Sequence, residues 1–148
     1  MSEASIYKSR SARLTCSAEE FYDFVTDVRN FERFISPDTF SNIKTEKSSL
    51  NFQVNVLGTV NLSITERTMY NKVVYKGETR EVKDFFLIMD IMNSGATDTD
   101  VTVTLQADLN PMLKILADSP VKRFLETLVE EMEKFKGWRD TKARSEPL

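Results

Sequence analysis

A chain of 148 residues, 41% of them hydrophobic, has the size of one domain and can build a core without disulfides. It contains no histidine and one cysteine, which excludes Ser-His-Asp and Cys-His catalysis, imidazole zinc sites and an internal disulfide. The net charge of −3, from 20 basic and 23 acidic residues, indicates an ordinary protein surface and no field that would steer nucleic acid.

The first predicted elements are a strand over residues 6–15 and two short helices. Ser17 and Glu20 form a capping box, S-x-x-E, in which each side chain accepts a hydrogen bond from an amide at the start of a helix. Apolar residues follow at helical spacing as far as Val28. A second short helix is expected over residues 31–35, before Pro37.

Between about residues 41 and 109 the apolar residues alternate with polar ones, which is typical of strands with one wet face. The clearest hairpin joins Phe52–Val56 to Val60–Thr65 through a turn at Gly58. Strands at short spacing with short turns favour an antiparallel meander. Further strands are expected over residues 73–78, 85–92 and 101–107.

The last predicted element is a long helix from Pro111 to about Lys136. Asn110 is a typical N-cap, and proline is favoured at the first helical position. Ser119-Pro120 repeats that signature, so we expect a kink or a restart there. Gly137 is expected to terminate the helix, and residues 139–148 to form a frayed tail.

This order of elements predicts an α+β fold. A curved antiparallel sheet of 6–7 strands would grip the C-terminal helix, with the two short helices closing one end of the sheet. A sheet that is wet on one face must bury the other, and only the C-terminal helix is long enough to cover it. Residues 1–138 are therefore expected to form a single domain.

The chain resembles the START-like, or SRPBCC, superfamily, whose architecture is the Bet v 1-like helix-grip fold. The resemblance is carried by SAEEFYDFVTD (17–27), NFERF (30–34), LNPMLK (109–114) and PVKRFL (120–125). It implies an apolar cavity between sheet and helix. Members of the superfamily include lipid carriers, hormone receptors, quinone-binding proteins, polyketide cyclases and chaperone activators, so the likeness specifies a fold more than a function.

We expect the chain to bind or carry a small apolar ligand, of lipid or polycyclic type, in that cavity. One alternative is a polyketide cyclase or dehydratase that uses cavity Asp, Glu, Arg and Tyr side chains, and another is a protein-interaction module similar to chaperone activators. The residues expected to line the cavity are Phe24, Phe34, Phe52, Val54, Leu62, Tyr75, Leu87, Met89, Val103, Leu105, Leu113, Leu116 and Phe124.

Three charged residues are candidate polar anchors for a ligand: Glu66, Arg80 and Asp90. Asp90 stands out because it interrupts an apolar run, and burial would raise its pKa. The competing interpretation places Asp90 on an exposed face with Phe86 and Ile88, and explains the other two by surface ion pairs. Tyr7, Tyr70 and Tyr75 could present hydroxyl groups to the cavity, although such tyrosines more often serve packing.

Residues 85–92 carry apolar side chains on both faces of a predicted strand, so the outer face, with Phe86, Ile88 and Met92, is a candidate homodimer contact. Coverage by long neighbouring side chains is the alternative. Cys16 is interpreted as a small residue at a strand–helix junction. No cofactor, metal or nucleic-acid partner and no transmembrane segment is expected, because glycine-rich phosphate loops and long apolar runs are missing from the sequence. The expected location is the cytoplasm.

Overall fold

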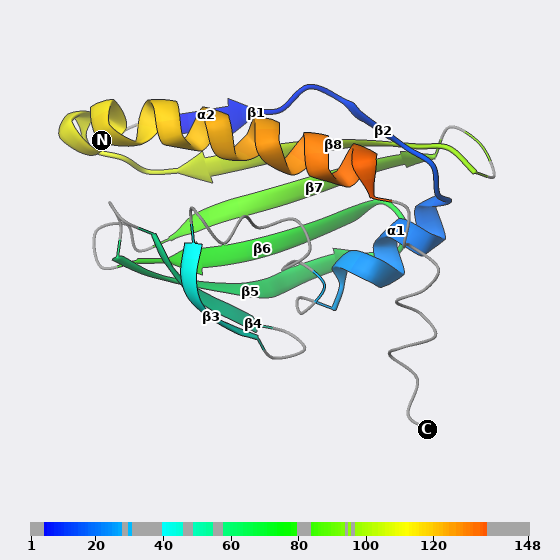
Figure 1. Ribbon diagram of the computed structural model, residues 1–148, viewed down its shortest axis with the longest axis horizontal. Coiled ribbons are helices and arrows are strands. Elements are labelled where there is room, and N and C mark those ends of the chain that lie inside the picture. The colour runs from blue at the N-terminus through cyan, green and yellow to red at the C-terminus, as the bar shows by residue number, and fades with distance from the viewer. Residues whose placement is uncertain are drawn as a thin grey trace.

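The structure, a computed structural model, contains one antiparallel sheet in the order β1-β8-β7-β6-β5-β4-β3, with β2 also paired to β8 (Figure 1). Strands β3 to β8 are neighbours in chain order, so the sheet is a meander with the first strands lying beside the last. The residues that the structure describes are 5–27, 30, 40–45, 49–54, 58–79, 84–93, 95 and 97–135, without the side chains at 40–43, 45, 54 and 58.

The strands are short at the N-terminus and longer in the centre of the sheet. Their bounds are β1 (Ser5–Lys8), β2 (Ala12–Leu14), β3 (Phe40–Thr45), β4 (Ser49–Val54), β5 (Gly58–Thr68), β6 (Lys72–Glu78), β7 (Phe85–Asn93) and β8 (Thr99–Ala107). Together with the long C-terminal helix, they confirm the predicted α+β helix-grip architecture.

The single strand predicted over residues 6–15 is divided into β1 and β2. The division falls at Ser9, whose hydroxyl accepts a hydrogen bond from the Val103 amide at 2.9 Å, where a continuous ladder would use a backbone carbonyl. Both pieces pair with β8 and occupy the same position in the sheet. The second short helix predicted over residues 31–35 and the tail predicted after residue 138 lie outside the described residues.

Helix α1 (Ala18–Val25) begins at the predicted capping box. The Glu20 amide donates to Ser17 Oγ at 3.1 Å, and the Ser17 amide donates to Glu20 Oε1 at 2.9 Å. The helix buries Phe21, Phe24 and Val25 and packs against β6 and β7. It therefore closes one end of the sheet (Figure 1).

Helix α2 (Pro111–Lys134) runs along the sheet, and its backbone lies nearest to β1 and β2 (Figure 1). Asn110 caps it as predicted, because its side chain accepts from the Leu113 amide at 2.9 Å. The helix continues through Pro120 without restarting, so that part of the prediction was wrong. Phe135 caps its C-terminal end, and the predicted terminator Gly137 lies outside the described residues.

The core lies between α1, α2 and the face of the sheet that they cover, called the inner face below. Burial of these apolar side chains is the main favourable contribution to the stability of the fold. The buried core residues of the sheet include Ala12, Leu14, Leu50, Phe52, Val60, Leu62, Val73, Tyr75, Leu87, Met89, Ile91, Val101 and Val103. α2 adds Leu125, Leu128, Val129 and Met132.

A glycine shapes the inner face in the middle of the sheet. Gly77 lies opposite Phe85 in the β6–β7 register. A Cβ at position 77 would overlap the Phe85 ring, so the ring lies over the glycine in space that any other residue would occupy. Glycine therefore allows the close approach of the Phe85 ring, which any larger residue at position 77 would force to move.

The opposite face of the sheet, called the outer face, is apolar along β7 as predicted. Phe86 lies between Lys76 and Gln106, and Ile88 is similarly flanked by neighbouring strands. Both are half-buried, which agrees with coverage by neighbouring side chains, whereas Met92 at the end of the strand is exposed. The homodimer contact stays a prediction.

Candidate functional site

The candidate site is the inner face of the sheet together with the side of α2 that faces it. Leu87, Met89 and Val103 form the centre of this face and are almost completely buried. Strand alternation places each of them on the same side as its cross-strand neighbour, since Leu87 pairs with Leu105 and Met89 with Val103. The result is a continuous apolar surface.

Most residues predicted to line a cavity do lie on this surface or pack against it. Leu105, Leu113 and Phe124 are partly buried at its margin. Phe34 lies outside the described residues, as does the side chain of Val54. The fully buried members of the predicted set are Phe24, Phe52, Leu62, Tyr75, Leu87, Met89 and Val103.

Leu116 is a correction to the predicted lining. Its side chain is 52% exposed, and Met112 and Ile115 beside it are 73% and 79% exposed. The core-facing stripe of α2 instead begins with Leu113 and Ala117, which are partly buried against the core. At 3.6 residues per turn, Leu116 then points away from the sheet.

The predicted polar anchors are also corrected. Asp90 lies on the outer face, is exposed, and pairs with Lys72, whose Nζ is 3.8 Å from Asp90 Oδ1. Glu66 is exposed and pairs in register with Val74, whose neighbour Ile88 is on the outer face. The surface-charge interpretation therefore describes both residues better, and Arg80 lies outside the described residues.

A β-bulge explains why Glu66 faces outward. Strict alternation after Leu62 and Ile64 would place residue 66 on the inner face. The β5–β6 register instead shifts between Ile64 and Glu66, so that Thr65 is an extra residue and Arg67 lies opposite the buried Val73. Arg67 is thus an inner-face residue that the sequence analysis missed. The signal in the sequence was Glu66, a charged residue at a position that strict alternation would bury.

The tyrosines serve different purposes. The Tyr75 hydroxyl donates to the Val25 carbonyl at 2.6 Å, and its complete burial raises its pKa, so it joins β6 to the last turn of α1. Tyr70 is at the surface, with its ring edge-on to Tyr22 at a centroid distance of 5.4 Å. The Tyr7 hydroxyl is buried without a hydrogen-bond partner among the described residues. Burial, followed by the nearby Asp118 carboxylate, raises the pKa of Tyr7.

Comparisons with solved structures agree with this geometry. A START superfamily protein from Mycobacterium smegmatis is 17% identical with a TM-score of 0.59, and the match covers 88% of this chain and 99% of that one. Mll3558 from Rhizobium loti is 12% identical with a TM-score of 0.61 over the same shares. Norcoclaurine synthase from Thalictrum flavum, in complex with dopamine and hydroxybenzaldehyde, is 8% identical with a TM-score of 0.64, covering 91% and 90%.

The chain has the START-like, Bet v 1-like fold. Neither family models nor curated proteins match its sequence. At these identities the structural likeness establishes the START-like fold and leaves the activity open.

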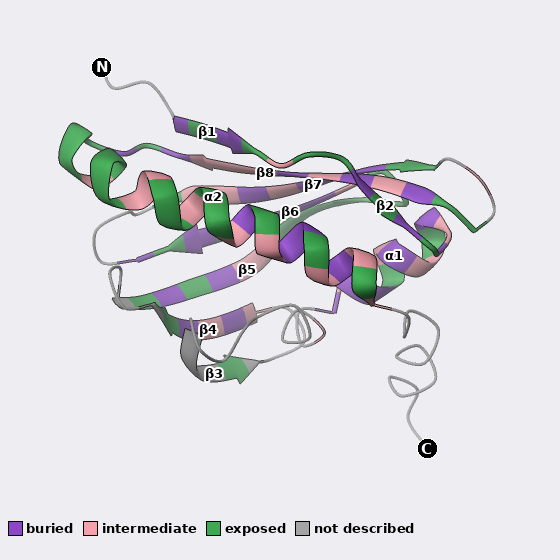
Figure 2. Cartoon of the chain, turned by 45° about the horizontal axis from the view of Figure 1, so that its top comes forward, coloured by how far each residue is buried: buried purple, intermediate pink, exposed green. Residues whose placement is uncertain are grey.

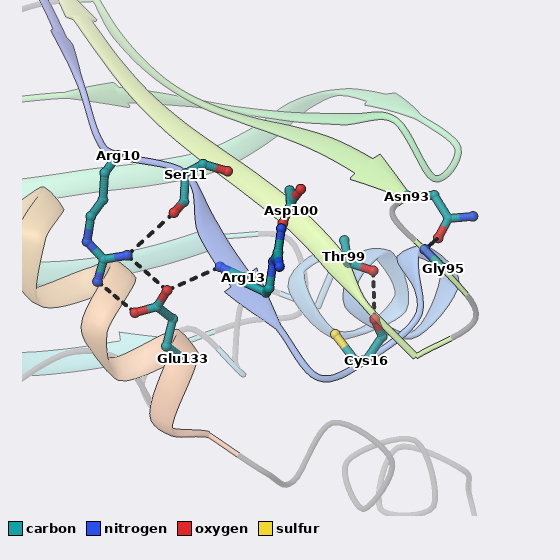
Figure 3. A network of polar contacts seen from close by, with 9 residues as sticks. All are labelled: Arg10, Ser11, Arg13, Cys16, Asn93, Gly95, Thr99, Asp100 and Glu133. Atoms are coloured by element: carbon teal, nitrogen blue, oxygen red, sulfur yellow. Dashed lines mark hydrogen bonds and ion pairs between the residues drawn. The ribbon is translucent and has the colours of Figure 1, made fainter.

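Within this START-like fold, the second half of α2 (residues 121–134) is fastened to the first strands by Glu133 (Figure 3). Its carboxylate accepts from both terminal nitrogens of Arg10, at 2.6 and 2.9 Å, and from the Arg13 amide at 3.1 Å. Arg10 contributes most to holding the pKa of Glu133 below its usual value. Arg13 is itself paired with Asp100, at 3.4 Å.

Cys16 lies between β2 and α1, at the strand–helix junction where the sequence analysis placed it. It is buried, its carbonyl accepts from the Thr99 hydroxyl at 2.6 Å, and burial raises the pKa of its thiol to about 12 (Figure 3). The thiol is therefore protonated at neutral pH, and a nucleophilic role is disfavoured.

A groove of about 380 Å³ lies between β1 and α2. Its lining mixes Ile6, Leu125 and Val129 with the charged residues Lys8, Arg10, Lys122 and Glu126. Within the described ranges no three potential metal ligands come together, and no helix is long and apolar enough to cross a membrane.

Proposed function

We propose that this chain binds and carries a small apolar molecule between the inner face of the sheet and the first half of α2 (residues 111–120), and that it does so in the cytoplasm. The observation that supports this is the incomplete burial of that half. It has no fully buried side chain (Figure 2). Leu113 and Ala117 pack against the core but are only partly buried. Apolar surface left over beside an apolar face is suited to an apolar ligand.

The solved structures add a precedent at the level of the fold. Norcoclaurine synthase binds dopamine and hydroxybenzaldehyde, which are small aromatic molecules, on the same architecture. A cyclase-like enzyme would need several ionisable groups converging on the ligand. On the inner face, the described strand positions carry a single charged side chain, that of Arg67. Carriage is therefore better supported than catalysis.

The test uses a matched pair of tryptophan substitutions on α2. Ala117→Trp places a large ring on the core-facing side, and Met112→Trp places the same ring on the exposed side. Binding of the neutral fluorescent probe N-phenyl-1-naphthylamine is followed by its emission. We expect Ala117→Trp to weaken binding about tenfold or more, equivalent to about 1.4 kcal/mol, and Met112→Trp to leave it unchanged.

Thermal unfolding monitored by circular dichroism ensures that both variants are folded. If the wild-type chain fails to bind the probe, and native mass spectrometry after gentle purification repeatedly finds it without a bound molecule, the proposal is wrong. Equal losses in the two variants would place the ligand elsewhere.

A further inference from the structure

The bulge in β5 places a cation on the inner face at a point where strict alternation would place the carboxylate of Glu66. Thr65 is the extra residue, and its hydroxyl bonds the Val74 carbonyl at 3.5 Å. From there to the end of the strand the faces are exchanged, so Arg67 pairs with Val73, whose side chain is completely buried on the inner face. A guanidinium group is thereby placed on the side of the sheet that α1 and α2 cover.

Leaving β3 aside, the described strands have one charged side chain at their inner-face positions, and it is Arg67. On β6, β7 and β8 these positions are held by apolar, aromatic, glycine or uncharged polar residues, and β4 contributes Leu50 and Phe52. No carboxylate in the described part of the chain forms an ion pair with Arg67. Lys72, by contrast, is a cation of the same hairpin that faces outward and is paired with Asp90.

The position of Arg67 is at the rim of the face and not at its centre. It is close enough to Tyr75 to lower the pKa of that hydroxyl, although burial raises the pKa more. Tyr70, in the turn of the same hairpin, lies edge-on to Tyr22 of α1 at a centroid distance of 5.4 Å, so the end of the hairpin that carries Arg67 lies near this helix. The Arg67 side chain is exposed and therefore keeps its hydration without a ligand.

We propose that the molecule bound on the inner face is an anionic amphiphile whose acidic group is held by Arg67. This rests on the proposed function and names the chemical class of its ligand. The planar guanidinium can donate two parallel hydrogen bonds to a carboxylate, a sulfate or a phosphate oxygen pair. The apolar body of the ligand extends onto the apolar surface, and the charged group stays at the rim, where it remains partly hydrated and avoids the cost of burying a charge.

The experiment compares lauric acid with methyl laurate, which have the same acyl chain but differ in charge. Affinities are measured by isothermal titration calorimetry below the micelle concentration at neutral pH. A charge-assisted contact predicts a roughly tenfold preference of the wild-type chain for laurate. Arg67→Gln should remove this preference without weakening the ester, and Arg67→Lys should keep part of it.

Lys72→Gln is the matched control, because it removes the same charge from the same hairpin on the opposite face. It should retain the full preference for laurate. If neither laurate nor its ester binds the wild-type chain, the proposed carriage of such ligands is wrong, and this inference with it. If both bind equally well, or if Arg67→Gln keeps the preference, carriage stands and the role of Arg67 is overturned.

Discussion

The two halves of α2 belong to one continuous helix, yet they are stabilised in different ways. Residues 121–134 bury Leu125, Leu128, Val129 and Met132 and are fastened by the Arg10–Glu133 contact. Residues 111–120 bury no side chain completely, and only Leu113 and Ala117 among them pack against the core (Figure 2). This half also has local contacts, namely the Asn110 cap and the Asp118–Lys122 pair at 3.2 Å. The second half is therefore held by complete burial and an ion pair, whereas the first half combines local helix contacts with partial packing of Leu113 and Ala117.

The part of α2 that is fixed on the sheet is therefore distinct from the part that we propose to contact a ligand. The side chains that hold the helix most firmly on the sheet lie toward its C-terminal end, where Glu133 binds Arg10 and the Arg13 amide of β2. The N-terminal half is left with exposed apolar side chains, which is where low local stability is expected and where a ligand can be admitted. Substitutions in the two halves test this division.

The largest expected effect comes from truncating one methionine in each half. Met132 is completely buried and Met112 is 73% exposed, so Met132→Ala removes core packing and leaves a cavity, whereas Met112→Ala does not. We expect Met132→Ala to lower the free energy of unfolding by about 2–5 kcal/mol. Met112→Ala should stay within about 0.5 kcal/mol of the wild-type chain. Urea denaturation measures both, and similar losses at the two sites would contradict the division.

A smaller effect is expected for Glu133→Gln, which removes the charge that Arg10 binds. Both side chains are partly exposed, so the loss at neutral pH should be about 1 kcal/mol or less. The pKa of Glu133 is lowered in the folded state, so its contribution is present above the unfolded value of about 4.3 and is lost as the pH falls through the lower folded value. Variant and wild-type stabilities should therefore converge below about pH 4.

Asp118→Asn is the counterpart of Glu133→Gln in the first half. Asp118 is paired with Lys122 within the same helix, and its carboxylate also lies near the buried hydroxyl of Tyr7 on β1. Thermal unfolding of this variant at neutral pH should be close to that of the wild-type chain. A larger loss for Asp118→Asn than for Glu133→Gln would show that the first half is also held by tertiary contacts.

The most local effect is expected for Asn110→Ala, which removes the helix cap. The cost should be about 1 kcal/mol or less, because a partly frayed first turn exposes groups that water can satisfy. Hydrogen exchange should quicken at residues 111–116 and remain unchanged at residues 125–132. Faster exchange along the whole helix would mean that the two halves unfold together.

Local signals in the sequence predicted much of the fold because they depend on neighbouring residues alone. The capping box of Ser17 and Glu20 and the Asn110 cap both form as predicted. The alternation along β7 correctly separated Leu87 and Met89 from Phe86 and Ile88. The resemblance to START-like proteins, carried by the same segments, is confirmed at the level of the fold.

The candidate site was predicted less completely. It depends on which side chains of a helix or strand face the core, and several choices fit the local sequence equally well. Met112, Leu113 and Leu116 all fit an apolar stripe, and only packing against the sheet decides that Leu113 faces the core and Leu116 does not. Strict alternation would place Glu66 on the inner face, but the β5–β6 register contains a bulge that brings Arg67 there instead.

The sequence by itself determined the order of elements, the starts of both helices and the apolar character of the inner face. Each follows from spacing and from caps that act within a few residues. The tertiary structure alone decided that Glu133 fastens α2 to Arg10, across a sequence separation of 123 residues, and that Arg67 lies on the inner face. Both depend on the relative placement of elements distant in sequence, since a register shift or a helix rotation is fixed by the total burial that it allows.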